Sequence, residues 1–277
     1  MRDKPYVIAI KYTILITLCI IMMLPVLVAF LGSIRTTGEF ITQPFGLPTR
    51  GIQLENYRLI LTDPGFWRST LNSVAITFGV TILNIILSSM LAFVFSRMTF
   101  RTKNIWFNIL SVGLLFPLVV AILPIFIQIR NFGLTGSLLG VILPMAAFGI
   151  PGSVVILRGF FISVPKELEE AAYIDGANIY QFFYRILIPI VRPAIFAVAT
   201  IQIIAAWNEC FLPLVVLTGA TEAWPLPLGL MQFQGQYGTD WSAVMTYITI
   251  LMIPAIIFYL FIQRYIVTGL TGGELKG

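Results

Sequence analysis

The stretch that decides the fold reads ELEEAAYIDGANIYQFFYRILIPI, residues 167–190, and it lies in a polar break that runs from Leu157 to Pro193. The sequence on either side of this break is strongly apolar. A loop between membrane helices needs only turn residues and a few charges, whereas this break carries the start and stop signals of two short helices. We therefore interpret it as a surface that a partner protein grips.

The first short helix is predicted from its two ends. Pro165 fits the first turn of a helix, with Ser163 or Val164 as the cap. Gly176 is a natural stop because glycine accepts a left-handed backbone without penalty. Acidic residues favour the positive end of the helix dipole, and three of them occupy the early turns: Glu167, Glu169 and Glu170.

A second short helix follows directly. Asn178 is predicted to cap it, and it is expected to run from Ile179 to Leu187 and to end at Pro189. Ala171 and Ala172 in the first helix would expose backbone for the close approach of a partner. The alternative is an amphipathic helix at the membrane surface whose acidic residues serve only as caps.

The composition is that of an integral membrane protein. The 277 residues are 58% hydrophobic and 10% charged, and the mean hydropathy is +0.94. A soluble domain carries about 25% charged residues. The chain has no histidine, and its two cysteines, Cys19 and Cys210, lie in apolar stretches. These absences argue against a metal site, a disulfide framework and a membrane-embedded enzyme.

Six segments are long and apolar enough to span a bilayer. The expected spans are Tyr12–Leu31, Thr70–Phe95, Ile105–Gln128, Leu138–Leu157, Ala194–Leu217 and Ser242–Ile262. The first is too long for the apolar core of a signal peptide, so we expect it to be retained. Twelve Lys and Arg residues fall on the side that holds both termini, against five on the other side. Both termini and the 157–193 break are therefore expected in the cytoplasm, which also accounts for the net charge of +5.

The spacing within the break resembles a known motif. Glu170-Ala171-Ala172, then Gly176, Ile186 and finally Ile188-Pro189 is similar to the EAA motif of permease subunits in binding-protein-dependent ABC importers. That family usually has Leu before the proline, where this chain has Ile188. Three further stretches resemble the carbohydrate branch, above all its maltose-type second permease: Trp207-Asn208-Glu209, Pro225 to Leu230, and the tail Gly269 to Gly277.

The resemblance implies an all-α, type I ABC importer permease bundle with a cytoplasmic coupling helix, in a prokaryotic inner membrane. The whole of 1–277 is then one transmembrane domain. Its parts are the N-terminal tail and first span (1–34), an outer loop (35–69), the core spans two to six (70–265) with the coupling segment (158–193), and a cytoplasmic tail (266–277).

The resemblance also implies a transport subunit without catalysis of its own. Its partners would be a second permease as a heterodimer, two ATPase subunits, an extracytoplasmic solute-binding protein and membrane lipid, with no nucleic acid. None of the five lysines follows a glycine, so the chain has no phosphate-binding loop of the Walker type. ATP and Mg are therefore expected on the partner ATPase, and no cofactor on this chain.

The implied cargo is a sugar or oligosaccharide. The alternatives are an ABC importer permease for a non-sugar solute (glycerol phosphate, an amino acid or a peptide) and an autonomous secondary carrier. Carriers of the second kind often show paired halves with broken helices, which six spans with one intramembrane acid fit poorly.

The candidate site residues form three groups. The ATPase-coupling group is Glu170, Ala171, Ala172, Asp175, Gly176, Ala177, Ile186 and Pro189. Polar residues of the spans are candidates for the substrate path: Gln202, Asn208, Glu209 and Asn84. An ionisable residue inside a membrane is a functional candidate because a bare charge there is costly.

The path candidates lie on two predicted helix faces. In the fifth span, Gln202, Ala205, Ala206 and Glu209 are expected on one face, next to Asn208. In the second span, Asn84 belongs to a polar stripe, Thr77, Thr81, Asn84 and Ser88. Packing between helices is the competing role for both, and it is favoured for the second-span stripe.

The third group lies in the outer loop around Met231–Thr239, which the resemblance identifies as a scoop loop that contacts the binding protein: Gln232, Gln234, Gly235, Tyr237 and Gly238. Its Gln and Gly content also suits an ordinary exposed turn. The tail from Thr268 to Gly277 resembles tails that reach the ATPase dimer, and a frayed end is the alternative.

Overall fold

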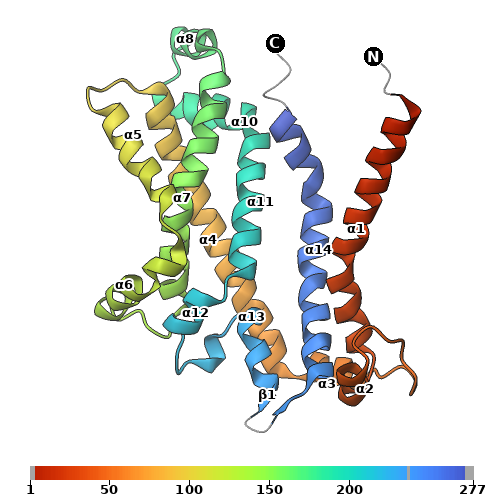
Figure 1. Ribbon diagram of the computed structural model, residues 1–277. Coiled ribbons are helices and arrows are strands. Elements are labelled where there is room, and N and C mark those ends of the chain that lie inside the picture. Colours follow the sequence, from red (N-terminus) through yellow and green to blue (C-terminus); the bar gives the residue numbers. More distant parts are fainter. Residues whose placement is uncertain (1–3, 236–237, 272–277) are drawn as a thin grey trace. The chain divides into compact units, whose positions relative to one another are not determined.

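A computed structural model describes residues 4–235 and 238–271 (Figure 1). The chain divides into two compact units. The first comprises Met1–Trp67 and Gly229–Pro254, and the second comprises Arg68–Leu228 and Ala255–Gly277. The two units are described separately below.

The first unit begins with a long apolar helix, α1 (Pro5–Ser33). The segment expected as an outer loop follows, and it contains two short helices, α2 (Thr37–Thr42) and α3 (Glu55–Thr62). Near its other end, η4 (Leu230–Phe233) precedes a small antiparallel hairpin of β1 (Gln234–Gly235) and β2 (Gly238–Thr239). The first part of α14 (Trp241–Thr271) completes the unit.

Arg35 organises the segment that follows α1. Its side chain is 1% exposed. The guanidinium donates hydrogen bonds to the carbonyl oxygens of Leu31, Gln43 and Pro44, at 3.1, 2.7 and 2.8 Å. Next to it, Thr36 and Glu39 form a capping box at the start of α2. The expected outer loop is therefore an ordered structure around one buried arginine.

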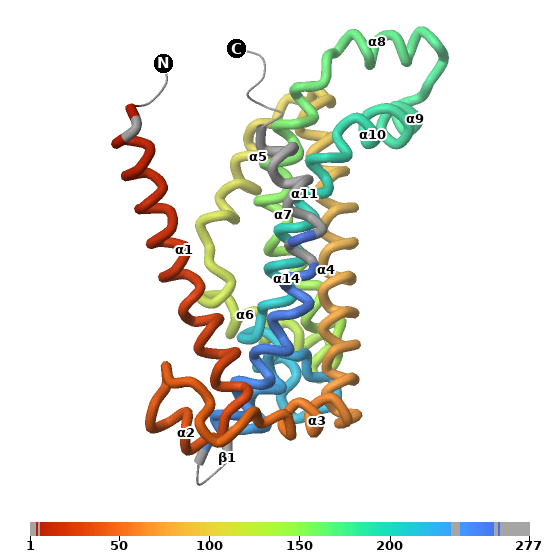
Figure 2. The backbone as a smooth tube through the Cα atoms, turned by 90° about the vertical axis from the view of Figure 1, so that its right-hand side faces the viewer, coloured from red at the N-terminus to blue at the C-terminus, as the bar shows by residue number. Residues whose placement is uncertain are grey.

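The second unit contains most of the helices. In chain order they are α4 (Pro64–Arg97, from Arg68 on), α5 (Lys103–Val112), η1 (Gly113–Leu115), α6 (Leu118–Asn131), α7 (Leu138–Ser163), α8 (Lys166–Ile174), α9 (Ile179–Gln181), η2 (Phe182–Leu187), α10 (Ile188–Ile190), α11 (Arg192–Asn208), α12 (Phe211–Val216), η3 (Thr221–Ala223) and α13 (Leu226–Gly229). Helices α8, α9 and α10 gather at one end of this unit, past the ends of α4 and α7 (Figure 2).

Hydropathy located the spans better than it located their breaks. In the described part of the chain, three helices are long and apolar enough to cross a membrane: Tyr6–Ser33, Pro64–Arg97 and Leu138–Ser163. The number rises to five if each of two bent helix pairs is one span. The sixth expected span lies in α14, whose described apolar run is Trp241–Ile257.

Two expected spans are not continuous helices. The third, Ile105–Gln128, bends by 105° between Leu115 and Leu118. Pro117 lies at this break, and a proline has no N–H to continue a helical ladder. The fifth, Ala194–Leu217, stops at Asn208 and resumes at Phe211. Both spans were therefore wrong as single helices, although their apolar residues lie where expected.

Candidate coupling site

The start of α8 differs from the prediction. Ser163 is the last residue of α7, and its hydroxyl donates to the carbonyl of Phe160, so it does not cap α8. Val164 and Pro165 form an extended link, and Pro165 takes the cap position with no side-chain hydrogen bond. The expected Ser163 or Val164 cap was wrong because α7 continues farther than the polar break suggested.

The end of α8 confirms the role of Gly176. Its φ is +84°, a left-handed conformation that side chains disfavour. The N–H of Ala177 donates to the carbonyl of Ala172 at 2.9 Å, and the N–H of Gly176 donates to that of Tyr173 at 3.1 Å. This pair of bonds is a Schellman motif, with Asp175 as the C-cap. The turn therefore fixes the direction of the chain as it leaves α8.

The second helix also begins as predicted. Asn178 accepts from the N–H of Gln181, and the Gln181 side chain accepts from the N–H of Asn178. The helix then widens into a π turn, η2, and runs past Pro189 to Ile190. A proline donates no hydrogen bond, so the turn before it is free to widen. The expected end at Pro189 was one residue short.

The two alanines of the motif differ in exposure. Ala172 is 6% exposed and belongs to an apolar core that also contains Phe161 and Phe182. Ala171 is exposed. The expectation that both alanines expose backbone was therefore wrong for Ala172, because a nine-residue helix packed on one side must bury one face.

The outward side of α8 forms a continuous face, which we call the docking face. It consists of Glu167, Glu170, Ala171 and Ile174, all exposed and spaced at helical intervals. Ile174 is 85% exposed, which is unusual for an isoleucine outside the apolar spans. The face thus combines two carboxylates, a small residue and one projecting apolar side chain. Of the other predicted coupling residues, Ala177 and Ile186 are half-buried and Pro189 is exposed.

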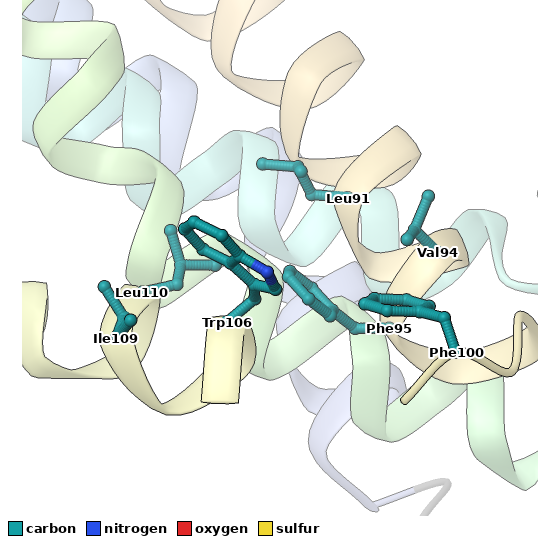
Figure 3. Close-up of a pocket in the computed structure, with 7 residues that line it drawn as sticks. All are labelled: Leu91, Val94, Phe95, Phe100, Trp106, Ile109 and Leu110. Carbon is teal, nitrogen blue, oxygen red and sulfur yellow. The ribbon is translucent and has the colours of Figure 1, made fainter. Parts of the chain in front are cut away.

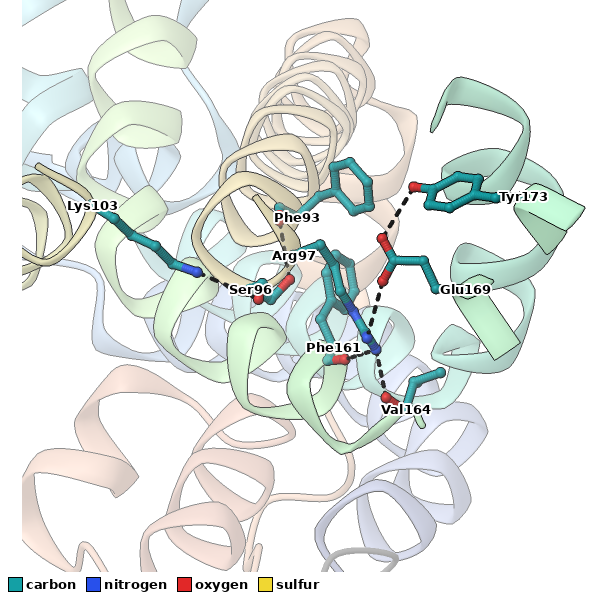
Figure 4. A network of polar contacts seen from close by, with 8 residues as sticks. All are labelled: Phe93, Ser96, Arg97, Lys103, Phe161, Val164, Glu169 and Tyr173. Atoms are coloured by element: carbon teal, nitrogen blue, oxygen red, sulfur yellow. Dashed lines mark hydrogen bonds and ion pairs between the residues drawn. The ribbon is translucent and has the colours of Figure 1, made fainter. Parts of the chain in front are cut away.

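The inward side of α8 holds a polar network that the sequence did not predict (Figure 4). Arg97 Nη1 lies 3.3 Å from Glu169 Oε2, and Arg97 Nη2 donates to the carbonyls of Phe161 and Val164, each at 2.6 Å. The Tyr173 hydroxyl donates to Glu169 Oε1 at 3.1 Å. We call Arg97, Glu169 and the two carbonyls the Arg97 joint. Burial and the neighbouring Glu169 raise the pKa of Tyr173, so its hydroxyl remains a donor at neutral pH.

Two of the substrate-path candidates are buried together. Asn84 donates to the carbonyl of Ala146 at 3.0 Å and accepts from the Ser153 hydroxyl at 2.7 Å. Gln202 donates to the same hydroxyl at 3.2 Å. A Cβ at Gly149 would meet the side-chain amides of Gln202 and Asn84, so a larger residue there would displace these amides. These contacts are those of polar packing between α4, α7 and α11. The rest of the second-span stripe, Thr77, Thr81 and Ser88, is buried as well.

The other two path candidates lie at the break in the fifth span. Asn208 is exposed, and its amide donates to the carbonyl of Ile204. Glu209 was expected to share a helical face with Gln202. It follows the last residue of α11, so this expectation was wrong. Its carboxylate accepts from the N–H groups of Phe211 and Leu212 at 2.8 and 3.1 Å. The carboxylate therefore lies at the break and accepts from the first N–H groups of α12.

The loop around Met231–Thr239, expected on the outer side, contains the hairpin of β1 and β2, in which Gln234 pairs with Thr239 and Gly235 with Gly238. Gln232 is exposed in the turn before it. Tyr237 lies outside the described residues, as does the tail from 272 to 277. Among the described residues, no group of three or more His, Cys, Asp or Glu side chains could hold a metal ion.

A pocket of about 340 Å³ lies between the ends of α4 and α5 (Figure 3). Its lining is apolar: Leu91, Val94, Phe95, Phe100, Trp106, Ile109 and Leu110. Hydroxyl-rich solutes need hydrogen-bonding partners in a binding site. This pocket therefore does not suit a hydrophilic cargo.

Apolar helices with a separate pair of short helices past their ends, one of them with an exposed acidic and apolar face, define a membrane component. Comparison with known proteins agrees with this class. The chain belongs to the family of binding-protein-dependent transport system inner membrane components, whose model matches residues 84–272.

Several relatives match over nearly the full chain. The diacetylchitobiose uptake system permease protein NgcG of Streptomyces coelicolor is 33% identical over 270 residues, covering 97% of this chain and 89% of that protein. The trehalose/maltose transport system permease protein MalG of Thermococcus litoralis is 36% identical over 228 residues, covering 81% of each chain. The relatives are thus transport permease proteins.

Solved structures give the same fold. A chain of a bacterial ABC transporter involved in the import of the acidic polysaccharide alginate matches with a TM-score of 0.81 at 25% identity, covering 96% of this chain and 98% of that one. The methionine transporter MetNI matches with a TM-score of 0.55 at 17% identity, covering 75% and 99%. The expected ABC importer permease fold is therefore confirmed.

The sequence pointed to the coupling segment but missed two of its features. Arg97 entered the prediction only as one of the positive charges that set the orientation. The sequence could have indicated the role of Arg97 through its position as the last residue of an apolar helix. A cation at that position can reach the carbonyls at the end of a neighbouring helix. Ile174 has no such signal, because an isoleucine in a short helix is normally buried.

Proposed function

We propose that this chain forms half of the translocation pathway of an ATP-driven sugar importer, beside a second permease, two ATPase subunits and an extracytoplasmic binding protein. The docking face of α8 carries this proposal. It would dock in the ATPase subunit, which holds ATP and Mg, since this chain has no phosphate-binding loop. ATPase closure would then move α8 and change the packing of the spans as a rigid-body transition.

Both termini and α8 would lie in the cytoplasm. The Lys and Arg balance supports this orientation. It is tested by single cysteines at Ala171 and at Gln232, in a background without Cys19 and Cys210. In intact cells, a membrane-impermeant maleimide should label position 232 and leave position 171 unlabelled. Labelling at position 171 alone would show that the chain has the opposite orientation in the membrane.

The docking role is tested by charge and by shape. Glu170→Arg and Ile174→Asp should lower uptake at least about tenfold, because a central anchor of an interface is worth about 2 kcal/mol or more. Gly176→Pro should do the same, since proline cannot adopt the positive φ of that turn. The matched control is Glu55→Arg, a first-turn carboxylate in α3. Normal uptake by the first two variants would sink the docking role.

The cargo class rests on the relatives, whose names include diacetylchitobiose, arabinooligosaccharides and maltose. The reconstituted importer with its binding protein should take up at least one of these three sugars. An osmoprotective compound, named for another relative, and an amino acid serve as comparison solutes. Uptake of the comparison solutes alone would contradict a sugar cargo.

The remaining predicted residues have narrower roles. The β1–β2 hairpin would enter the cleft of the binding protein, and deletion of Gln234–Gly238 should impair release of sugar from it while assembly is kept. Asn208, which is exposed beside the α11–α12 break, would line the path, with Glu209 holding the break open. The tail after Thr268 would reach the ATPase pair. Unchanged uptake after the hairpin deletion would refute the first of these roles.

A further inference from the structure

The connection between α8 and the membrane helices is short in sequence. Only Val164 and Pro165 separate the end of α7 from the start of α8. A two-residue link fixes the position of a helix end but leaves the direction of the helix to other contacts. Those contacts therefore decide which span moves when α8 is pushed.

The Arg97 joint supplies such a contact. Arg97 is the last residue of α4, and its side chain is 3% exposed. One of its terminal nitrogens lies against Glu169 in the first turn of α8, and the other donates to two carbonyls at the end of α7 (Figure 4). The guanidinium thus connects three helices at the place where α7 leads into α8.

The chemistry of the joint is directional. A guanidinium presents its donors in a fixed plane, so one carboxylate and two carbonyls around it must keep their relative positions. Apolar contacts, such as those of Ala172 with its core, allow small slides because they have no preferred direction. The joint therefore resists rotation of α8 relative to α4 in a way that the surrounding core does not.

We propose that Arg97 and Glu169 are positioning residues that make α4 follow α8 during the transport cycle. This inference rests on the proposed docking of α8 on an ATPase. Neither residue belongs to the docking face, because Glu169 points inward beside Ala172 and Tyr173. A variant of the joint should therefore keep the ATPase bound and lose the transmission of its movement.

The experiment uses the complete importer in liposomes, with sugar-loaded binding protein. Glu169→Ala and Arg97→Met are compared with Lys166→Ala, which removes an exposed charge in the same turn of α8 but outside the docking face. Three quantities are measured for each: cross-linking of a cysteine at position 171 to the ATPase, stimulated ATP hydrolysis, and sugar taken up per ATP. If the importer with Arg97→Met does not assemble, Glu169→Gln replaces it as the second joint variant, because glutamine keeps the shape of the side chain and one acceptor oxygen.

In the joint variants, we expect cross-linking to persist and uptake per ATP to fall at least about fivefold, the lower end of typical coupling between two sites. Lys166→Ala should match the wild type, and Glu169→Asp, which keeps the charge, should recover part of the loss. Wild-type uptake per ATP in Glu169→Ala would overturn the proposal. A fall in hydrolysis and uptake in equal proportion would also overturn it, because it would show a role in stability alone. Loss of cross-linking in the wild type would instead refute the docking of α8.

Discussion

Arg35 and Arg97 are both buried, one in each compact unit, but their charges are met differently. Arg35 donates to three carbonyls that all lie within ten residues of it in the sequence, and no described carboxylate pairs with it. Arg97 donates to two carbonyls and one carboxylate that lie 64 to 72 residues away. The first arginine therefore shapes one continuous segment, whereas the second joins separate helices.

This difference separates folding from mechanism. A charge satisfied by backbone dipoles nearby stabilises a local structure that has one arrangement. An ion pair between distant helices ties the movements of those helices together, because the pair breaks if one helix moves without the other. We therefore expect substitutions at Arg35 to act on stability and those at Arg97 to act mainly on coupling.

The largest effect is expected for Arg35→Met. It leaves the carbonyls of Leu31, Gln43 and Pro44 without their donor. Each of these carbonyls that water does not reach should lower the free energy of unfolding by about 1–3 kcal/mol. Limited proteolysis between residues 36 and 54 should become much faster, and less importer should assemble. Arg50→Met, at an exposed position, is the control. Equal proteolysis of the two variants would remove the distinction drawn for Arg35.

Arg97→Lys should have a smaller effect on stability. Lysine keeps the positive charge but cannot serve a carboxylate and two carbonyls in one plane. We expect a loss of about 1–3 kcal/mol, measured as a lower unfolding temperature of the purified complex. Arg101→Lys, an exposed change in the following loop, should leave the temperature unchanged. A loss as large as that of Arg35→Met would show that the joint is chiefly a folding element.

Glu39→Gln tests the local character of the first unit through pH. Hydrogen bonds from the Thr49 hydroxyl, and from backbone N–H groups, lower the pKa of Glu39 from 4.5 to about 2. The folded segment favours the ionised carboxylate. The contribution of Glu39 to the stability of this segment is therefore complete above pH 4.5 and is lost as the pH falls toward 2. Pepsin cleavage of the 36–54 segment should accelerate across that window in the wild type. The variant should show a weaker dependence, and an identical profile would contradict the assignment.

The smallest effect is expected for Tyr173→Phe. It removes one hydrogen bond to Glu169 and leaves the Arg97 pair in place, which should cost about 0.5–1.5 kcal/mol. Uptake per ATP should stay within about twofold of the wild type, because the Arg97–Glu169 pair is still present. This change is small beside the loss of at least about fivefold that we expect when the pair is broken. If this variant uncoupled transport as strongly as Glu169→Ala, the hydroxyl rather than the guanidinium would be the essential partner.

The sequence predicted those features that depend on neighbouring residues. Gly176 ends α8 and Asn178 caps the next helix, because both effects act within one helical turn. Hydropathy likewise located the apolar segments. It did not reveal the break beside Glu209 in the fifth span, since a window average treats one acid as a small dip in hydropathy.

Contacts between distant segments were beyond such reasoning. Nothing near Arg97 in the sequence indicates Glu169 as its partner, and the burial of Ala172 instead of Ala171 depends on how α8 is rotated. The same holds for Asn84 and Gln202, which were candidates for the substrate path and lie buried around Ser153. Their polarity was visible in the sequence, but the direction in which each side chain points was not.

The π turn at Phe182–Leu187 has a consequence for the evolution of the family. Each residue in a helix turns the chain by about 100°, so loss of one residue there would convert the turn to a regular helix and rotate everything after it. Pro189 and the whole of α11 would then face new neighbours. Length, not only residue type, should therefore be conserved between Asn178 and Pro189, and natural insertions and deletions should collect outside that interval.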